Sequence, residues 1–272
     1  MSLLQEQYSD SKNFMARVEL TRRFKTNPYS WILWIFDQIQ FPDKARVLEI
    51  GCGNGLLWKA NSNRIPEDAH IILSDFSKGM LSDARMVLGD EANLFEYQVL
   101  DAQEIPYPDN SLDIVIANLM LYHIPDRRKA ISEISRVLKS DGALYATTFG
   151  LENTKEISEL VSAYDDEIYY SLVPLARAFG LENGEKQLSE SFDQVQLIKY
   201  QDGLEVTEAG PLVDYILSFG KVNQALNGHN RKNFEDYIEG IIKKDGMIKI
   251  TKDNGIFVAT HPIRSYPAKN MV

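Results

Sequence analysis

The amino-acid sequence predicts an α/β fold built on a doubly wound, mostly parallel sheet. Through the first 150 residues, short apolar runs alternate with stretches of helical periodicity, and the first run passes directly into a glycine-rich turn. Strands that alternate regularly with helices favour a parallel sheet with helices on its faces. The five runs expected to form strands are 46–50, 70–74, 95–100, 112–117 and 143–149.

The size and composition suit one domain with a full α/β core. The chain has 272 residues, of which 44% are hydrophobic, and a mean hydropathy of −0.26. Its net charge of −10 and pI near 5.0 argue against unaided binding of nucleic acid, which depends on clustered Lys and Arg. Small or neutral ligands fit this charge better.

The cysteine count and the hydropathy pattern indicate a reducing, aqueous compartment. The single cysteine, Cys52, excludes an internal disulfide network and a thiolate metal cluster, and the four His are scattered, so we predict no metal. No run of about 18 apolar residues would span a bilayer, and the N-terminus lacks a signal-peptide pattern. We therefore expect a cytoplasmic protein without membrane attachment.

The N-terminal residues 3–40 are expected to be helical. Apolar residues recur near helical spacing as far as Phe24, and charged residues occupy the other faces. Asn27-Pro28 interrupts the pattern, and a strongly apolar, buried helix is expected over 29–39.

The first strand ends in the turn that points most clearly to a ligand. Gly51, Gly53 and Gly55 alternate there, and glycine permits both positive φ and close approach of a ligand to the main chain. A dinucleotide fingerprint would need glycine in place of Leu56, and no Gly-Lys-Ser/Thr follows for a P-loop. The carboxylate of Glu49 at the strand end would repel a diphosphate and attract an ammonium. Taken alone, such a turn also occurs as an ordinary βα connection.

This acid and glycine spacing resembles the first motif of the class I S-adenosylmethionine-dependent methyltransferases. The residues assigned to the donor site here are Glu49, Gly51, Cys52, Gly53 and Gly55. The resemblance implies S-adenosylmethionine as methyl donor and S-adenosylhomocysteine as product. It also implies a seven-stranded, Rossmann-like sheet that is mostly parallel, with an antiparallel last strand.

The second strand is expected to end at Asp75. In a parallel sheet this position lies at the carboxyl end of the strand, beside the glycine turn, where ligands bind in doubly wound folds. The carboxylate could accept hydrogen bonds from both hydroxyls of a ribose, and charge-assisted bonds are the stronger kind. The alternative is an N-cap for a helix over 78–88. Phe76 and Met80 would flank the adenine, or else belong to the core.

The third strand is followed by DAQEIPYPDNSLDIVIAN, residues 101–118. This segment closely resembles the small-molecule methyltransferase subgroup that includes ubiquinone-pathway enzymes, methyltransferase types 11 and 25. By that resemblance, Asp101 contacts the adenine amino group and Ala102 belongs to the same part of the donor site. The alternative for Asp101 is a turn residue.

The fourth strand leads into Asn118, Tyr122 and His123. The resemblance places this stretch against the methionine part of the donor, so Asn118 is assigned to the donor and Tyr122 to the acceptor. A neutral His123 could act as general base, although the family carries His here in enzymes of different chemistries, which favours a packing role. The helix that begins at Asp126 is expected to end within 139–142, at a cation and a glycine.

The resemblance thins beyond residue 150. Residues 151–190 are expected to be helical and acidic, and such long connections are often functional. The acidic run 165–167 could recruit an amine, but a charge run is more often a solvated face. Later strands are expected at 195–200, 204–206 and 255–260, with helices at 211–219 and 233–242. The resemblance implies that the last two strands form an antiparallel hairpin at the sheet edge.

We predict one methyltransferase domain with three parts. These are an N-terminal helical lid (1–40), a donor-binding core (41–150), and a helical substrate-side insert after the fifth strand with the C-terminal strands (151–272). The candidates for acceptor contact in the lid are Tyr8, Phe14 and Arg17. The alternative is that these three pack on the outside of the sheet.

The expected reaction is methyl transfer to a small-molecule acceptor by in-line displacement. Alignment of reactants can lower a barrier by roughly 7 to 11 kcal/mol, so positioning can replace a catalytic triad. One alternative is an RNA or protein methyltransferase, which the charge and the lack of an Asn-Pro-Pro-aromatic tetrad after the fourth strand disfavour. Another is a non-catalytic, donor-binding regulatory partner. The acceptor, and the choice between monomer and homodimer, stay open.

Overall fold

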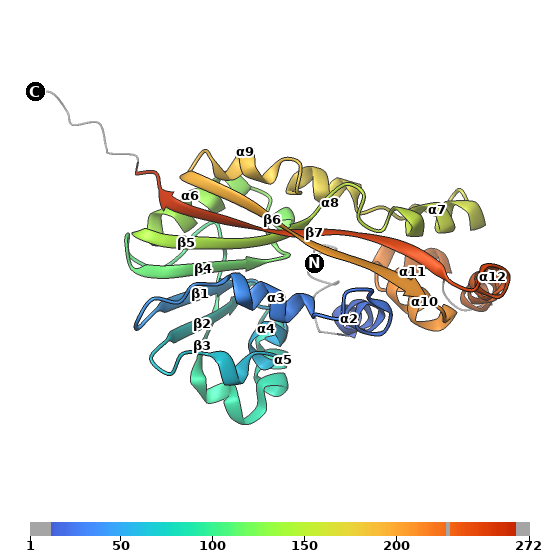
Figure 1. Cartoon of the computed structure of the whole chain (residues 1–272), viewed down its shortest axis with the longest axis horizontal. Coiled ribbons are helices and arrows are strands. Elements are labelled where there is room, and N and C mark those ends of the chain that lie inside the picture. The colour runs from blue at the N-terminus through green and yellow to red at the C-terminus, as the bar shows by residue number, and fades with distance from the viewer. Residues whose placement is uncertain (1–11, 227–228, 265–272) are drawn as a thin grey trace, which may run out of the picture.

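A seven-stranded sheet organises the chain in the computed structural model, which describes residues 12–226 and 229–264 (Figure 1). The strand order is β3-β2-β1-β4-β5-β7-β6. The strands are β1 (Arg46–Ile50), β2 (His70–Asp75), β3 (Phe95–Val99), β4 (Leu112–Asn118), β5 (Leu138–Phe149), β6 (Phe192–Val206) and β7 (Ile248–Pro262). Neighbours from β3 to β5 are parallel, whereas β7 is antiparallel to both β5 and β6. The predicted mostly parallel sheet with an antiparallel last strand is confirmed.

Helices cover the sheet and continue past its carboxyl edge. The first two are α2 (Lys12–Phe24) and α3 (Trp31–Gln38), which are separated at Asn27-Pro28 as the sequence predicts. The others are α4 (Leu56–Lys59), α5 (Lys78–Leu88), α6 (Arg127–Val137), α7 (Lys155–Tyr164), α8 (Val173–Ala178), α9 (Gly184–Leu188), α10 (Ala209–Leu217), α11 (Gly220–Leu226) and α12 (His229–Asp245). Within residues 12–226 and 229–264, no helix is both long and apolar enough to cross a membrane.

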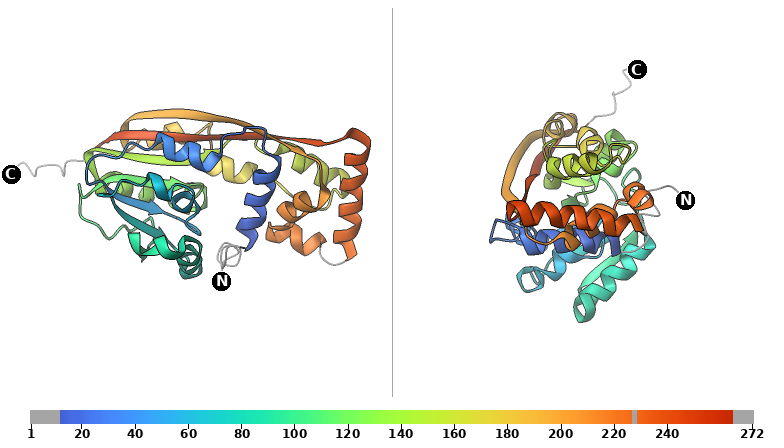
Figure 2. Two further views of the ribbon diagram at one scale, coloured as in Figure 1. Left: turned by 60° about the horizontal axis from the view of Figure 1, so that its bottom comes forward. Right: turned by 90° about the vertical axis from the view of Figure 1, so that its right-hand side faces the viewer.

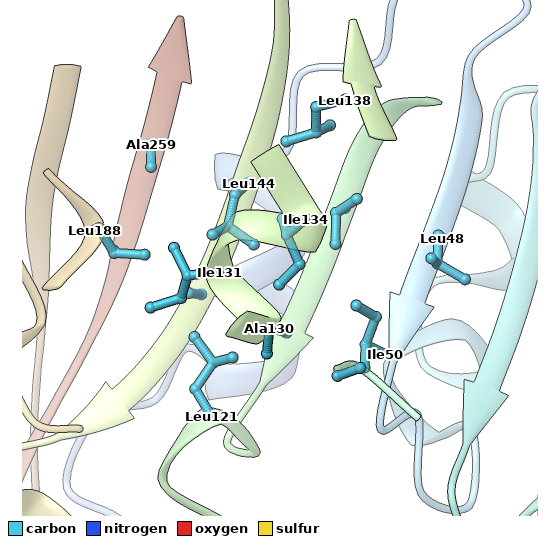
Figure 3. Close-up of a cluster of buried hydrophobic side chains, with 14 of the residues drawn as sticks. Leu48, Ile50, Leu121, Ala130, Ile131, Ile134, Leu138, Leu144, Leu188 and Ala259 are labelled. Atoms are coloured by element: carbon cyan, nitrogen blue, oxygen red, sulfur yellow. The ribbon is translucent and has the colours of Figure 1, made fainter. Parts of the chain in front are cut away.

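The two faces of the central strands carry separate apolar cores, because successive residues of a strand point to opposite faces. On one face, Leu48 and Ile50 of β1 pack in a cluster with Ile131 of α6 (Figure 3). On the other face, Val47 packs in a cluster with Trp58 of α4. Each of these side chains is at most 2% exposed, so each contributes about 1.5 to 3 kcal/mol or more through burial. Cores on both faces thus hold the end of β1 in place.

Strands β6 and β7 are longer than the parallel strands and extend beyond the end of β5 (Figures 1 and 2). Their outer halves pack with α2, α10 and α12 in a separate cluster, to which Leu20, Leu204, Ile216 and Ile250 belong. A backbone bridge between Lys25 and Leu204 attaches the end of α2 to β6. These two strands therefore hold the N-terminal helix and the late helices together past the carboxyl end of β5.

The expected end of the helix before β5 was wrong. Helix α6 ends at Val137, and the residues expected to finish it begin β5 instead. Leu138 pairs with Leu112 of β4, and the register then shifts before the pairing resumes at Ala143. A Cβ on Gly142 would lie 2.9 Å from the Asp113 carbonyl oxygen, so this glycine allows two strands to approach closely and does not stop a helix.

The two short strands expected near residue 200 are one strand. The connecting residues, including Gly203, pair with β7 in unbroken register, so the polar stretch that suggested a turn lies within the ladder. The antiparallel β6–β7 pair was predicted correctly. Strand β7 lies inside the sheet, however, and β6 forms its edge.

Candidate active site

The glycine turn between β1 and α4 leaves one main-chain position open. Gly51, Gly53 and Gly55 have φ angles of 70°, 55° and 73°. A Cβ on Gly51 would lie 3.0 Å from Met120 Cβ, and one on Gly55 would lie 3.2 Å from Leu88 Cδ1. A Cβ on Gly53 would meet nothing within 4 Å. The outer two glycines are therefore enclosed by protein, whereas Gly53 borders space that a ligand can occupy.

Asp75 closes this turn from the end of β2. Its Oδ2 accepts a hydrogen bond from the Gly53 amide (3.1 Å), and its Oδ1 accepts one from the Ser77 amide (2.8 Å). Burial raises the pKa of Asp75, and the hydrogen bonds from Ser77 and Gly53 oppose that rise. The cap of α5 is Ser77, whose Oγ accepts from the Met80 amide, so Asp75 does not serve as the N-cap. The Phe76 amide also acts as a donor toward this carboxylate. Since an ionised carboxylate has about four acceptor sites, Asp75 keeps capacity for a further donor.

Glu49 lies beneath the turn, 1% exposed. The Trp58 indole Nε1 donates a hydrogen bond of 2.6 Å to its Oε2. Burial raises the pKa of Glu49 to about 7, the hydrogen bond from Trp58 lowers it, and the nearby Asp75 raises it further. Burial also raises the pKa of the Cys52 thiol, which both carboxylates reinforce, so Cys52 is a neutral thiol. The turn therefore lies next to two buried carboxyl groups, and ionising both of them at once is energetically unfavourable.

A polar pair follows at the end of β4. The Thr147 hydroxyl donates to Asn118 Oδ1 (2.5 Å) and accepts from the Leu119 amide (2.9 Å). Thr147 is fully buried, so the orientation of Asn118 is fixed from β5. Because β1 pairs with β2 on one side and with β4 on the other, the glycine turn, Asp75 and Asn118 meet at one edge of the sheet. This edge is where doubly wound folds bind ligands.

Residues 48–146 match the family described as methyltransferase domain. These residues are therefore similar to a methyltransferase domain. The matched segment runs from β1 into β5 and contains the glycine turn, Asp75, Asp101 and Asn118.

One curated relative of the chain is the ubiquinone/menaquinone biosynthesis C-methyltransferase UbiE of Vibrio cholerae. It is 32% identical over 125 residues, which are 45% of this chain and 48% of that protein. The chain thus spans about half the length of the curated relatives that it matches first.

Solved structures that are described as methyltransferases share the fold of this chain. A putative methyltransferase from an antibiotic biosynthesis pathway of Anabaena variabilis superposes with a TM-score of 0.60 at 19% identity, over 84% of this chain and 96% of that one. Phosphoethanolamine N-methyltransferase 2 of Haemonchus contortus gives a TM-score of 0.57 at 21% identity, over 96% and 59%. The latter was solved with phosphomonomethylethanolamine and S-adenosylhomocysteine.

The two side chains predicted to flank an adenine differ in exposure. The Phe76 ring is 61% exposed beside Asp75, whereas Met80 is 2% exposed. Met80 lies in the first turn of α5, on the face of that helix that is buried. Phe76 can therefore offer a ring to a ligand, and the alternative assignment of Met80 to the interior fits its burial better.

Asp101 and Ala102 follow β3 within the segment 48–146. Asp101 is exposed, and its Oδ1 accepts from the Gln103 amide (2.9 Å) and from Gln103 Nε2 (3.1 Å). Ala102 belongs to the core on the α6 face. Asp101 thus stabilises its own turn while its carboxylate stays accessible, so the turn role and the ligand role are compatible.

Tyr122 and His123 belong to a short 3-10 helix, η3 (Leu121–His123), after β4. Their rings lie 4.5 Å apart, and the Tyr122 ring lies 5.0 Å from the Phe149 ring at the end of β5. Burial lowers the pKa of His123 to about 4, and the Arg17 guanidinium adds to the fall. The imidazole is therefore neutral at pH 7.

Among the three residues predicted for the lid, Arg17 is the one whose side-chain contacts the structure describes. Its Nε donates to Ser218 Oγ (2.9 Å), its Nη2 donates to the Ser218 carbonyl (3.0 Å), and its guanidinium lies 4.2 Å from the centre of the Phe219 ring. Tyr8 and the side chain of Phe14 lie outside the described residues. Arg17 thus joins α2 to the end of α10 and also influences His123.

Sequence reasoning missed three hydroxyl residues near these groups. Thr147 fixes Asn118, while Thr154 and Tyr170 lie in the segment after β5. Thr147 pairs with Asn118 in the β4–β5 register, which only the sheet topology reveals. The acidic run 165–167 of the same segment is exposed, as expected for a solvated face. In the described part of the chain, no group of three His, Cys, Asp or Glu is placed to hold a metal ion.

Proposed function

We propose that the chain is an S-adenosylmethionine-dependent methyltransferase that methylates a small-molecule acceptor and releases S-adenosylhomocysteine. The observation that carries this proposal is the open main chain at Gly53, hydrogen-bonded to Asp75 at the carboxyl edge of β1 and β2. The match of residues 48–146 to a methyltransferase domain supports it, as does the C-methyltransferase activity named for the Vibrio cholerae relative.

The donor roles follow from the chemistry of each side chain. We assign to Asp75 the ribose hydroxyls, because its carboxylate retains acceptor capacity after the bonds from Gly53 and Ser77. The exposed Phe76 ring would stack on the adenine, and the accessible Asp101 would accept from its amino group. The glycine turn and Asn118 would border the methionine part.

The donor supplies an electrophilic methyl group on a positively charged sulfur. The role of the protein is then to align the acceptor and to exclude water. Such alignment can lower the barrier by roughly 7 to 11 kcal/mol. His123, neutral and beside the end of β4, can accept a proton from an oxygen or nitrogen acceptor. Its ring contact with Tyr122 fits a packing role equally well.

The remaining assignments concern the acceptor side. We propose that the N-terminal segment 1–40 and the segment 151–272 supply the acceptor pocket around the donor-binding core 41–150, as parts of one domain. Arg17 and Tyr122 are the acceptor-side residues for which the structure gives contacts. With a net charge of −10, a small molecule in the cytoplasm suits the chain better than nucleic acid.

Two measurements on the full-length protein test this function. Calorimetry should detect binding of S-adenosylmethionine and S-adenosylhomocysteine, and a panel of small oxygen, nitrogen and carbon acceptors should show transfer of a labelled methyl group. Donor binding without transfer to any acceptor would favour a regulatory module. A protein that binds neither nucleoside would refute the proposal.

Two glycine variants separate ligand space from packing. We expect Gly53→Ala to cost about 1 to 2 kcal/mol of stability through its positive φ, and to weaken S-adenosylmethionine binding roughly tenfold or more, because the new methyl group enters the open space. Gly55→Ala has a similar φ but contacts Leu88, so about 1 to 3 kcal/mol of overpacking should add to its cost.

Urea unfolding and calorimetry on both variants provide the comparison. Of the two variants, Gly53→Ala should have the higher free energy of unfolding. Its loss of S-adenosylmethionine affinity should nevertheless be large compared with its loss of stability. If Gly53→Ala binds S-adenosylmethionine as tightly as the unmodified chain, the ligand does not approach the turn at this position.

A further inference from the structure

Strand β6 carries main-chain groups that point out of the sheet. It is the last strand in the order and has β7 on one side. A Cβ on Gly255 of β7 would lie 2.9 Å from the Ile198 carbonyl oxygen, so this carbonyl points toward β7. Successive residues of an antiparallel strand direct their main-chain groups to opposite sides. Val195, Leu197 and Lys199 therefore direct theirs away from β7.

The connection between α2 and α3 covers this outer side only in part. The Gly203 carbonyl accepts from the Thr26 amide (2.9 Å), and the Gln201 carbonyl accepts from Asn27 Nδ2 (2.8 Å). Both contacts lie on the side away from β7, as the alternation requires. Among residues 12–226 and 229–264, none is paired with the outer side of the segment 193–199. We call this segment the free edge.

The free edge lacks most features that keep edge strands from pairing with other chains. Such features include proline, bulges and inward-pointing charges. The free edge has no proline, and its pairing with β7 keeps one register from residue 194 onward. Val195, Leu197 and Ile198 are only half-buried, so apolar side chains accompany the outward main-chain groups. The free edge therefore offers a template for one more strand.

The charges of the free edge are complementary to themselves. Its single acid, Asp193, and its single base, Lys199, lie at its two ends, and both side chains are exposed. A two-fold axis through Gln196 would pair the whole free edge with that of a second copy. Asp193 would then lie opposite Lys199 of the second copy, and Val195 opposite Leu197 of the second copy. Opposite charges across an antiparallel pair are favourable, and a two-fold axis makes each contact twice.

We propose that the free edge is a dimer interface, in which β6 pairs antiparallel with β6 of a second copy about a two-fold axis at Gln196. The sheet then continues from one copy into the other, and hydrogen bonds between the copies satisfy the outward groups of Val195 and Leu197. Strand β1 lies inside the sheet, four strands away from β6 in the strand order. The dimer therefore leaves the glycine turn of each copy outside the interface.

Lys199 also has an alternative role, because lysine on an edge strand often prevents association. Its Nζ lies 3.1 Å from Asp253 Oδ1 of its own chain. An ammonium has three donors, so this ion pair leaves capacity for a carboxylate of the second copy. The two roles predict opposite results for Lys199→Gln. Loss of the charge weakens the dimer if Lys199 pairs with Asp193 of the second copy, and strengthens association if Lys199 is protective.

A cysteine pair tests the position of the two-fold axis. Facing residues that share no main-chain hydrogen bond lie about 4.5 Å apart at Cα, which suits a disulfide. Mild oxidation of full-length Gln196→Cys should therefore give a disulfide-linked dimer in non-reducing electrophoresis. Gln194→Cys, exposed on the same face, is the matched control. It should remain unlinked, because its counterpart would lie roughly 13 Å farther along the strand. The native Cys52 is buried.

Charge reversal tests the complementarity in solution. Sedimentation velocity of the unmodified chain should give twice the mass of 31.0 kDa. Asp193→Lys and Lys199→Asp should each raise the Kd of the dimer roughly tenfold or more, because like charges then face each other twice. The double variant should restore the dimer. Affinity for S-adenosylhomocysteine should stay unchanged throughout, and urea unfolding shows whether each variant keeps its fold.

Four results would overturn the proposal. These are a monomer at every concentration up to the solubility limit, a dimer that survives both single charge reversals, stronger association of Lys199→Gln, and equal disulfide linkage of Gln194→Cys and Gln196→Cys. The cysteine variants keep the native charges, so they decide the question even if a charge reversal disturbs the fold.

Discussion

Asp75→Ala is expected to weaken S-adenosylmethionine binding by about 1.5 to 3 kcal/mol, or roughly 10- to 150-fold, if Asp75 bonds the ribose in its charged form. The carboxylate already orients the turn by accepting from the Gly53 amide, and it retains acceptor capacity at the edge of the sheet where β1 and β2 end. Isothermal titration calorimetry with S-adenosylmethionine measures the loss directly.

Controls separate lost contacts from a disturbed turn. Asp75→Asn keeps the shape and removes the charge, so it should lie between the alanine variant and the unmodified chain. Asp90→Ala removes an exposed acid from the segment after α5 and should leave affinity unchanged. Urea unfolding without ligand reports any loosening of the turn. Full affinity in Asp75→Ala would remove this residue from the donor site.

Glu49→Gln is expected to raise the free energy of unfolding at pH 8 by up to about 3 kcal/mol. Burial raises the pKa of Glu49 from 4.5 to about 7, and each pKa unit corresponds to about 1.4 kcal/mol. At low pH the carboxyl is protonated in both states and the raised pKa costs nothing. As the pH rises from 4.5 to 7, the unfolded chain ionises first, so stability falls through this window and stays reduced above it.

The pH dependence is the decisive part of this prediction. At pH 4.5, Glu49→Gln and the unmodified chain should have nearly equal free energies of unfolding. At pH 8, the free energy of unfolding of Glu49→Gln should be the higher of the two. His123, with its pKa lowered to about 4, changes stability in the opposite direction between pH 4 and 6.5, but it is present in both proteins. The exposed Glu67→Gln is the control. A gap that is the same at both pH values would contradict the raised pKa.

The free-energy cost of burying the Glu49 carboxylate suggests a role for this residue in binding a cationic ligand. Its partner in the structure is the neutral Trp58 indole, which does not compensate a full negative charge. A cationic ligand at the turn would provide that compensation. We therefore expect Glu49→Gln to gain stability while it loses affinity for S-adenosylmethionine, as binding residues often trade one for the other.

The sequence predicted the donor half of the fold well because its signals are local. Apolar runs, the alternating glycines and the acid after the second run each lie within a few residues, and the expected helix 78–88 matches α5. The prediction from sequence failed where pairing between segments that are distant in the chain determines the structure. Gly142 suggested the end of a helix, but β4 draws that backbone into the sheet.

The acceptor side could not be predicted for the same reason. Thr154 and Tyr170 are ordinary residues of an acidic, helical segment when only their neighbours in sequence are considered. They become notable because α2 brings Arg17 near Tyr170 and because the fold buries both side chains. Neither fact has a counterpart in local sequence.

The position of β7 between β5 and β6 has a consequence for biosynthesis. Among the described strands, β6 pairs with β7, which follows it in the chain after α10, α11 and α12. While the chain emerges from a ribosome, the parallel half can assemble on its own residues. Apart from the short contact with Lys25, however, β6 has no neighbouring strand in the sheet until Ile248 and the residues after it appear. Nascent chains halted before that point therefore expose an unpaired strand, and they are the species most in need of a chaperone.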